Sequence, residues 1–203
     1  MSRWKPWHKR NCAVSPAFLA LLAAFAVVDR EHLLAPILLA AALHEMGHLA
    51  AVYLLGGEIA SFRITPFGGE LRLRHPERLS YGRELLAVLA GPMVNLLCAL
   101  VLARFAAYTL SGIHMTLALF NLLPLRLLDG GRALELLLSW RFQPILAGRV
   151  LHTLSCLCLG VLLMLCAALQ SIAGLQLPLL VLQAWFILCW CLETGIVKQG
   201  QTR

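Results

Sequence analysis

The chain has 203 residues, of which 60% are hydrophobic and 13% are charged, and its formal net charge is +7. A soluble domain has about 45–50% apolar and about 25% charged residues, and a disordered chain is poorer still in apolar residues, so both classes are excluded. The Lys and Arg residues form no basic tract with interleaved aromatic residues, which argues against nucleic-acid binding. The composition predicts an integral membrane protein.

Apolar segments follow one another along the whole chain, separated by polar connections. They cover residues 13–28, 33–56, 84–106, 107–125, 147–169 and 176–192. A spanning helix needs about 20 predominantly apolar residues, so a chain of this length has room for five or six spans and little else. We therefore expect an all-α integral membrane protein of about six transmembrane helices, folded as a single membrane-embedded domain over residues 1–203.

The basic residues predict the orientation of these spans. With six spans, all of the 17 Lys and Arg residues except Arg30 and Arg104 lie on one side of the membrane. The positive-inside rule then places both termini and the two polar connections, 57–83 and 126–146, in the cytoplasm. One alternative stays open, because the basic start and the first apolar segment also resemble a signal peptide that is cleaved near Ala24-Phe25-Ala26.

The connection over 57–83 has the pattern of a β-hairpin. Apolar and polar residues alternate over 59–65 and again over 70–74, on either side of the turn Pro66-Phe67-Gly68-Gly69. We predict two strands there, with their apolar face against the membrane boundary. An irregular surface loop is the alternative interpretation.

The second apolar segment contains the motif H-E-x-x-H at residues 44–48. Residues four apart lie on one face of a helix, so His44 and His48 can bind one zinc ion at about 2.0–2.1 Å each. Glu45 adjoins the first ligand and is placed to act as general base toward a water at the metal. A polar helix face satisfied by neighbouring helices is the alternative. It is less favoured because ionisable groups about 17 Å into a membrane core are usually functional.

A catalytic zinc takes a third protein ligand, and Asp129 is the candidate. Most of the ten carboxylates lie in polar connections, whereas Asp129 follows an apolar segment that Pro124 interrupts. Gly130 and Gly131 then let the backbone turn, and irregular backbone at membrane depth occurs only where it is buried or lines a cavity. The residues leave a second interpretation equally open, in which Asp129 is the N-cap of a helix over 130–140.

Three motifs in chain order resemble those of the site-2 protease family, which are intramembrane zinc metalloproteases. The motifs are H-E-x-x-H at 44–48, Gly91-Pro92-Met93-Val94-Asn95, and the stretch that runs from Asn121 through Pro124 to Leu128-Asp129-Gly130-Gly131-Arg132. The resemblance covers residues 33–132 by motif. The compact six-span form most resembles the branch that includes the bacterial stage IV sporulation processing protease. Leu127 departs from the pattern, because a proline often precedes the L-D-G sequence in the family.

The resemblance implies roles for single residues. His44, His48 and Asp129 match the zinc ligands of the family, and Glu45 matches its catalytic glutamate. Asn95 and Asn121 match asparagines associated with the substrate-binding region, although either could instead form hydrogen bonds between helices. The hairpin over 59–74 resembles a membrane-embedded β element that presents an edge to an unwound substrate.

The function implied is that of an intramembrane zinc metalloendopeptidase with one Zn²⁺ per chain. It would hydrolyse peptide bonds of membrane-anchored proteins through a metal-activated water, in regulated intramembrane proteolysis in the bacterial cytoplasmic membrane. Sigma-factor precursors and anti-sigma factors are typical substrates in the family. Two other classes are weighed against it. The intact Glu45 argues against an inactive relative that only binds membrane partners, and the lack of a convincing repeat between the halves argues against a divalent-metal transporter.

His114 is the remaining polar residue of interest inside the apolar segments. It lies seven residues before Asn121 and so on roughly the same face of a helix. We expect it to form a hydrogen bond with a neighbouring helix rather than to take part in the chemistry.

Overall fold

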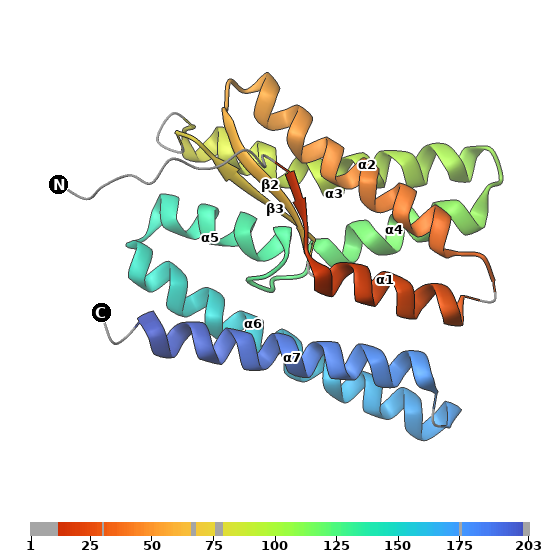
Figure 1. Ribbon diagram of the computed structural model, residues 1–203. Coiled ribbons are helices and arrows are strands. Elements are labelled where there is room, and N and C mark those ends of the chain that lie inside the picture. The colour runs from red at the N-terminus through yellow and green to blue at the C-terminus, as the bar shows by residue number, and fades with distance from the viewer. Residues whose placement is uncertain (1–11, 30, 66–67, 76–78, 175, 201–203) are drawn as a thin grey trace. The chain divides into compact units, whose positions relative to one another are not determined.

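The computed structural model describes residues 12–29, 31–65, 68–75, 79–174 and 176–200 of the chain and is mostly helical, with one small sheet. The helices are α1 Pro16–Val28, α2 Leu34–Leu54, α3 Tyr81–Arg104, α4 Tyr108–Asn121, α5 Asp129–Arg141, α6 Pro144–Ala173 and α7 Leu177–Gly200 (Figure 1). The strands are β1 Cys12–Val14, β2 Ile59–Thr65 and β3 Gly68–Leu73. The chain divides into two compact units, 1–117 and 118–203, and each is described by itself.

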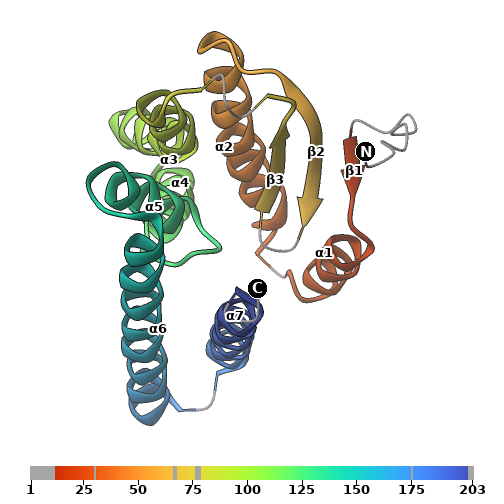
Figure 2. The same cartoon turned by 90° about the vertical axis from the view of Figure 1, so that its left-hand side faces the viewer.

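The first unit contains the sheet, in the order β1-β2-β3. β2 and β3 form an antiparallel hairpin, as predicted from the alternation of apolar and polar residues, with an irregular register at its open end. β1 pairs with β2 in parallel and covers residues that were expected to begin the first apolar helix. Figure 2 shows the hairpin running alongside α2. The turn residues 66–67 lie outside the described part of the chain.

Helices α2 and α3 pack against each other beside this sheet (Figure 1). Small residues allow the two helices to approach closely. A methyl group added to Gly47 would lie 2.9 Å from the backbone oxygen of Ala90, closer than a Cβ normally comes. Small residues at such crossings are typical of helices that pack in a membrane. This close pair carries most of the predicted site.

The second unit consists of the end of α4 and of α5, α6 and α7. α6 packs against both α5 and α7. The chain turns over residues 122–128 between α4 and α5, and the first turn of α5 packs tightly against this turn. A methyl group added to Gly130 or Gly131 would collide with the backbone of Leu122 or Leu125. Ser155 of α6 donates its hydroxyl to the carbonyl oxygen of Pro124 at 2.9 Å, which fixes this turn to α6.

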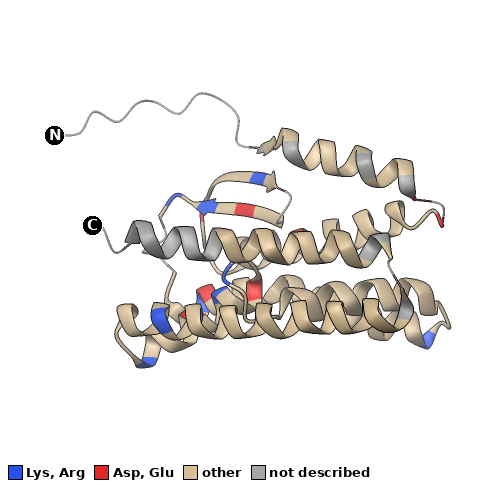
Figure 3. Cartoon of the chain, turned by 90° about the horizontal axis from the view of Figure 1, so that it is seen from below, with Lys and Arg blue, Asp and Glu red and all other residues tan. Residues whose placement is uncertain are grey.

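Three of the described helices are long and apolar enough to cross a membrane, namely α2, α3 and the Pro144–Ile172 part of α6. Their most apolar stretches are only 22–33% buried, and large apolar side chains such as Leu97, Leu100 and Met164 are more than half exposed. Charged residues are nearly absent from long parts of these helices (Figure 3). Such surfaces fit lipid rather than water, which supports a membrane protein. The count of six spans stays a prediction, since α1 has 13 residues and α4 has 14.

Candidate metal centre

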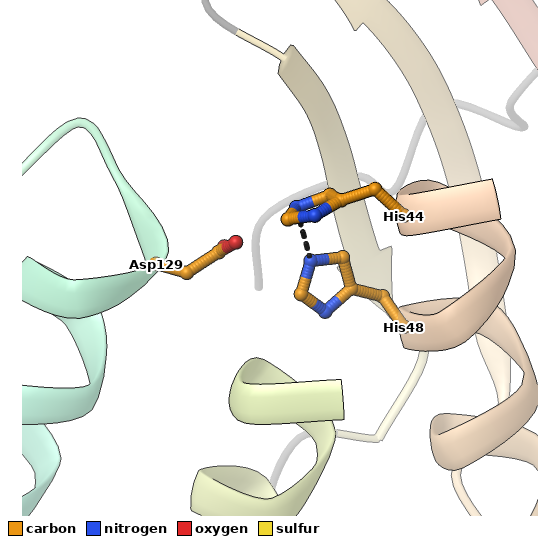
Figure 4. Close-up of side chains that lie close together, drawn as sticks. All are labelled: His44, His48 and Asp129. Atoms are coloured by element: carbon orange, nitrogen blue, oxygen red, sulfur yellow. Dashed lines mark hydrogen bonds between the residues drawn. The ribbon is translucent and has the colours of Figure 1, made fainter. Parts of the chain in front are cut away.

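The two histidines of the H-E-x-x-H motif lie one turn apart on α2, with their rings close together (Figure 4). Nε2 of His44 is 3.1 Å from Nε2 of His48, and the rings meet edge to face at 81°. Two nitrogens bound to one tetrahedral zinc ion at about 2.0–2.1 Å each lie about 3.4 Å apart. The two rings are therefore spaced nearly as a shared ion requires.

Helix α3 orients the ring of His48. Nδ1 of His48 lies 2.9 Å from the carbonyl oxygen of Ala87. Because a carbonyl only accepts, Nδ1 donates, and Nε2 of the neutral ring keeps its lone pair. Gly91, one turn further along α3, lies against the same ring, and a methyl group added there would collide with it. The glycine of the G-P-M-V-N motif is thus needed for the close approach of α3 to a predicted metal ligand.

Glu45 reaches from α2 to the β-hairpin. Its Oε1 accepts the backbone N–H of Gly69, in β3, at 2.8 Å. A methyl group added to Gly69 would collide with the same carboxylate. The hairpin therefore supplies a backbone donor to the predicted general base. Sequence analysis missed this contact, although the glycine pair in the turn was the signal that could have suggested a close approach.

Asn95 connects His44 to α4. Its Nδ2 lies 3.3 Å from Nδ1 of His44, and its Oδ1 lies 3.1 Å from Nδ1 of His114. All three side chains are buried, and Asn95 is fully so. His114 therefore does bond to a neighbouring helix, as expected from the sequence. No pattern in the sequence indicated that this bond leads, through the amide of Asn95, to a predicted metal ligand.

Asp129 is the first residue of α5, and the N-cap position before it belongs to Leu128. The Asp129 carboxylate and the imidazoles of His44 and His48 are the three groups that could hold a metal ion (Figure 4). The donor set suits zinc, which catalytic sites bind through three protein ligands that are commonly imidazole and carboxylate. Asn121 ends α4 and is partly exposed.

Comparison with known proteins finds two curated relatives that each match part of this chain. The chain is 30% identical over 112 residues to a zinc metalloprotease of Methanocaldococcus jannaschii, a match that covers 49% of this chain and 32% of the relative. It is 28% identical over 138 residues to stage IV sporulation protein FB of Bacillus subtilis, covering 61% of this chain and 46% of that protein. The chain thus spans less than half the length of these curated relatives. No family model matches it.

A solved structure shares the fold. The site-2 protease from Methanocaldococcus jannaschii superposes with a TM-score of 0.64 over 92% of this chain and 93% of that one, at 20% sequence identity. Together, the relatives and the fold support the site-2 protease family for this chain. These findings confirm the resemblance to the site-2 protease family that the three motifs indicate.

Proposed function

We propose that this chain is an intramembrane zinc metalloendopeptidase. In this proposal His44, His48 and Asp129 hold the metal, and Glu45 is the general base. The observation that carries it is the pair of Nε2 atoms 3.1 Å apart on α2, a helix apolar enough to span a membrane. Paired imidazoles beside a glutamate are costly inside a membrane, so they need a function, and binding one ion satisfies both lone pairs.

A bound zinc would supply Lewis-acid chemistry, polarising a peptide carbonyl and lowering the pKa of a water towards about 7. The chain's own groups move the proton. The Glu45 carboxylate takes a proton from the attacking water and afterwards returns it to the leaving amine. Its Oε1 also accepts the N–H of Gly69, and the other lone pairs of the carboxylate can accept from the water.

The substrate in this proposal is a membrane-anchored protein whose helix unwinds before cleavage, as in regulated intramembrane proteolysis. The sheet supports this substrate class. β3 pairs with β2 on one side, and no strand in the described part of the chain pairs with its other side. An unwound segment can add to such an edge through backbone hydrogen bonds. Sigma-factor precursors and anti-sigma factors remain the candidates that the family resemblance offers.

The first experiment counts zinc in the full chain purified in detergent. We expect about one zinc per wild-type chain, and loss of most of it in Asp129→Asn. Asparagine has nearly the same size and helix propensity as aspartate, so this variant keeps the local packing at the start of α5 but removes the anionic ligand. Equal zinc content in the two proteins would show that Asp129 serves only the start of α5. A folded wild type that binds no zinc would overturn the proposal.

The second experiment separates metal binding from catalysis. Glu45→Gln should keep the zinc content of the wild type and lose hydrolysis of a single-span test peptide in the same detergent. A variant that still cleaves would remove Glu45 from the mechanism. A variant that loses zinc as well would make Glu45 part of the metal site rather than the base. If the wild type binds zinc but cleaves no membrane-anchored protein co-expressed with it, the inactive relative becomes the better description.

A further inference from the structure

His114 and Asn95 belong to a series of hydrogen bonds that leads to the predicted metal ligand His44. Oδ1 of Asn95 only accepts, so Nδ1 of His114 donates to it. Nδ2 of Asn95 only donates, so Nδ1 of His44 accepts. On the other histidine of the pair, Nδ1 of His48 donates to the carbonyl oxygen of Ala87. The series thus leads from α4 through Asn95 on α3 to His44 on α2.

A metal on both histidines requires the opposite orientation of the Asn95 amide. A ligand imidazole binds through a lone pair, so Nε2 of His44 cannot keep its proton when a metal is bound. In the neutral ring the proton then lies on Nδ1, which needs an acceptor instead of a donor. Asn95 is fully buried and His44 is 5% exposed, so that acceptor has to come from the protein rather than from bulk water.

We infer that Asn95 and His114 are positioning residues that set the tautomer of His44 required of a metal ligand. Rotation of the Asn95 amide by half a turn places Oδ1 against Nδ1–H of His44. The same rotation places Nδ2 against Nδ1 of His114, which then accepts and carries its proton on Nε2. Each hydrogen bond survives with donor and acceptor exchanged. This inference rests on the proposed metal site.

The residue types fit this role. An amide has a donor and an acceptor of nearly the same shape, so it serves either tautomer without moving its backbone. An imidazole can likewise donate or accept at one nitrogen, so His114 follows the amide in both directions. Outer-shell partners of this kind fix the ring orientation of a histidine ligand and raise its basicity. The only covalent changes are proton positions within rings that stay neutral.

The test measures metal binding by the full chain in detergent, with no substrate. Zinc affinity is obtained by competition with a chelating dye, and the visible spectrum of the Co²⁺-loaded protein reports ligand geometry. Asn95→Leu should lower zinc affinity by about 10–100-fold, as loss of an outer-shell partner usually does. Asn95→Asp should keep or exceed wild-type affinity, because a carboxylate accepts permanently from Nδ1–H of His44. His114→Gln should keep the affinity that His114→Leu loses.

A matched control comes from the same pair of helices. Ser111 of α4 donates its hydroxyl to the carbonyl oxygen of Ala99 in α3 at 2.8 Å, and this bond is not part of the series that reaches His44. Ser111→Ala should therefore leave zinc affinity and the Co²⁺ spectrum unchanged. If it weakens zinc as much as Asn95→Leu does, then packing of α3 on α4 explains the loss and the inference fails.

Two further outcomes overturn the inference while leaving the proposed function intact. One is a zinc-binding wild type together with an Asn95→Leu variant of equal affinity and identical Co²⁺ spectrum. The other is an Asn95→Asp variant that folds but binds zinc as poorly as Asn95→Leu, since an acceptor alone would then not suffice. A wild type without zinc, in contrast, would defeat the proposed metal site itself.

Discussion

Replacing Gly91 with alanine tests whether α3 orients the metal ligand His48. The added methyl group would lie 2.6 Å from Cε1 and 2.8 Å from Cδ2 of the His48 ring, well inside normal contact. The ring can move only by giving up its hydrogen bond to Ala87 or its approach to His44. Forcing an extra methyl group into a packed site typically costs about 1–3 kcal/mol. If that cost falls on the metal-binding conformation, zinc affinity should drop by roughly 5–150-fold.

Gly82 provides the matched control on the same helix. A methyl group added there meets nothing within 4 Å, so Gly82→Ala should be neutral or should stabilise α3 by up to about 1 kcal/mol. Both variants are compared by chelator competition for zinc and by thermal unfolding in the absence of metal. The reasoning is refuted if Gly91→Ala binds zinc as tightly as Gly82→Ala. If Gly91→Ala folds only in part, the Co²⁺ spectrum of its folded fraction is compared with that of the wild type. An identical spectrum would show that the methyl group does not displace the His48 ring, and the prediction would fail.

Three further outcomes follow from the same contacts. Gly69→Ala should abolish peptide cleavage while keeping zinc, because the new methyl group collides with the Glu45 carboxylate; an active variant would mean that this carboxylate moves freely. Ser155→Ala should lower the free energy of unfolding by about 1–2 kcal/mol, because it leaves the Pro124 carbonyl without its hydroxyl donor. As a control, Thr153→Ala, on the exposed side of the same helix, should change this free energy by less than about 0.5 kcal/mol. Stripping the metal with a chelator should lower the melting temperature, because zinc at 100 times its Kd stabilises the native state by about 2.7 kcal/mol; an unchanged melting temperature would argue that no metal is bound.

The bond between Glu45 and Gly69 connects the proposed base to the strand proposed to receive substrate. The carboxylate holds a backbone N–H of β3 at 2.8 Å. The second oxygen of the carboxylate can accept from a water while this bond is kept. The contact therefore explains how the proposed base is held in a defined position by a hydrogen bond from a backbone N–H.

Much of the local structure could be predicted because it depends on local periodicity. The apolar segments over 33–56 and 84–106 correspond to α2 and α3, and the alternation over 59–65 corresponds to β2. The spacing in H-E-x-x-H places two rings on one helix face because the α-helix has about 3.6 residues per turn. Boundaries were less predictable. β1 replaces the expected first turn of a helix, since its backbone pairs with β2, a strand far away in sequence.

The sequence by itself therefore determined the membrane class, the helical segments, the hairpin and the histidine pair with its neighbouring glutamate. Tertiary structure decided what surrounds these groups. Asn95 meets His44 across 51 residues, and Gly69 meets Glu45 across 24. Such pairs depend on how closely two helices cross and on which face a hairpin turns toward them. Neither the closeness of a helix crossing nor the orientation of a hairpin can be predicted from a periodic pattern in one sequence. Both are set by the packing of whole surfaces rather than by the order of neighbouring residues.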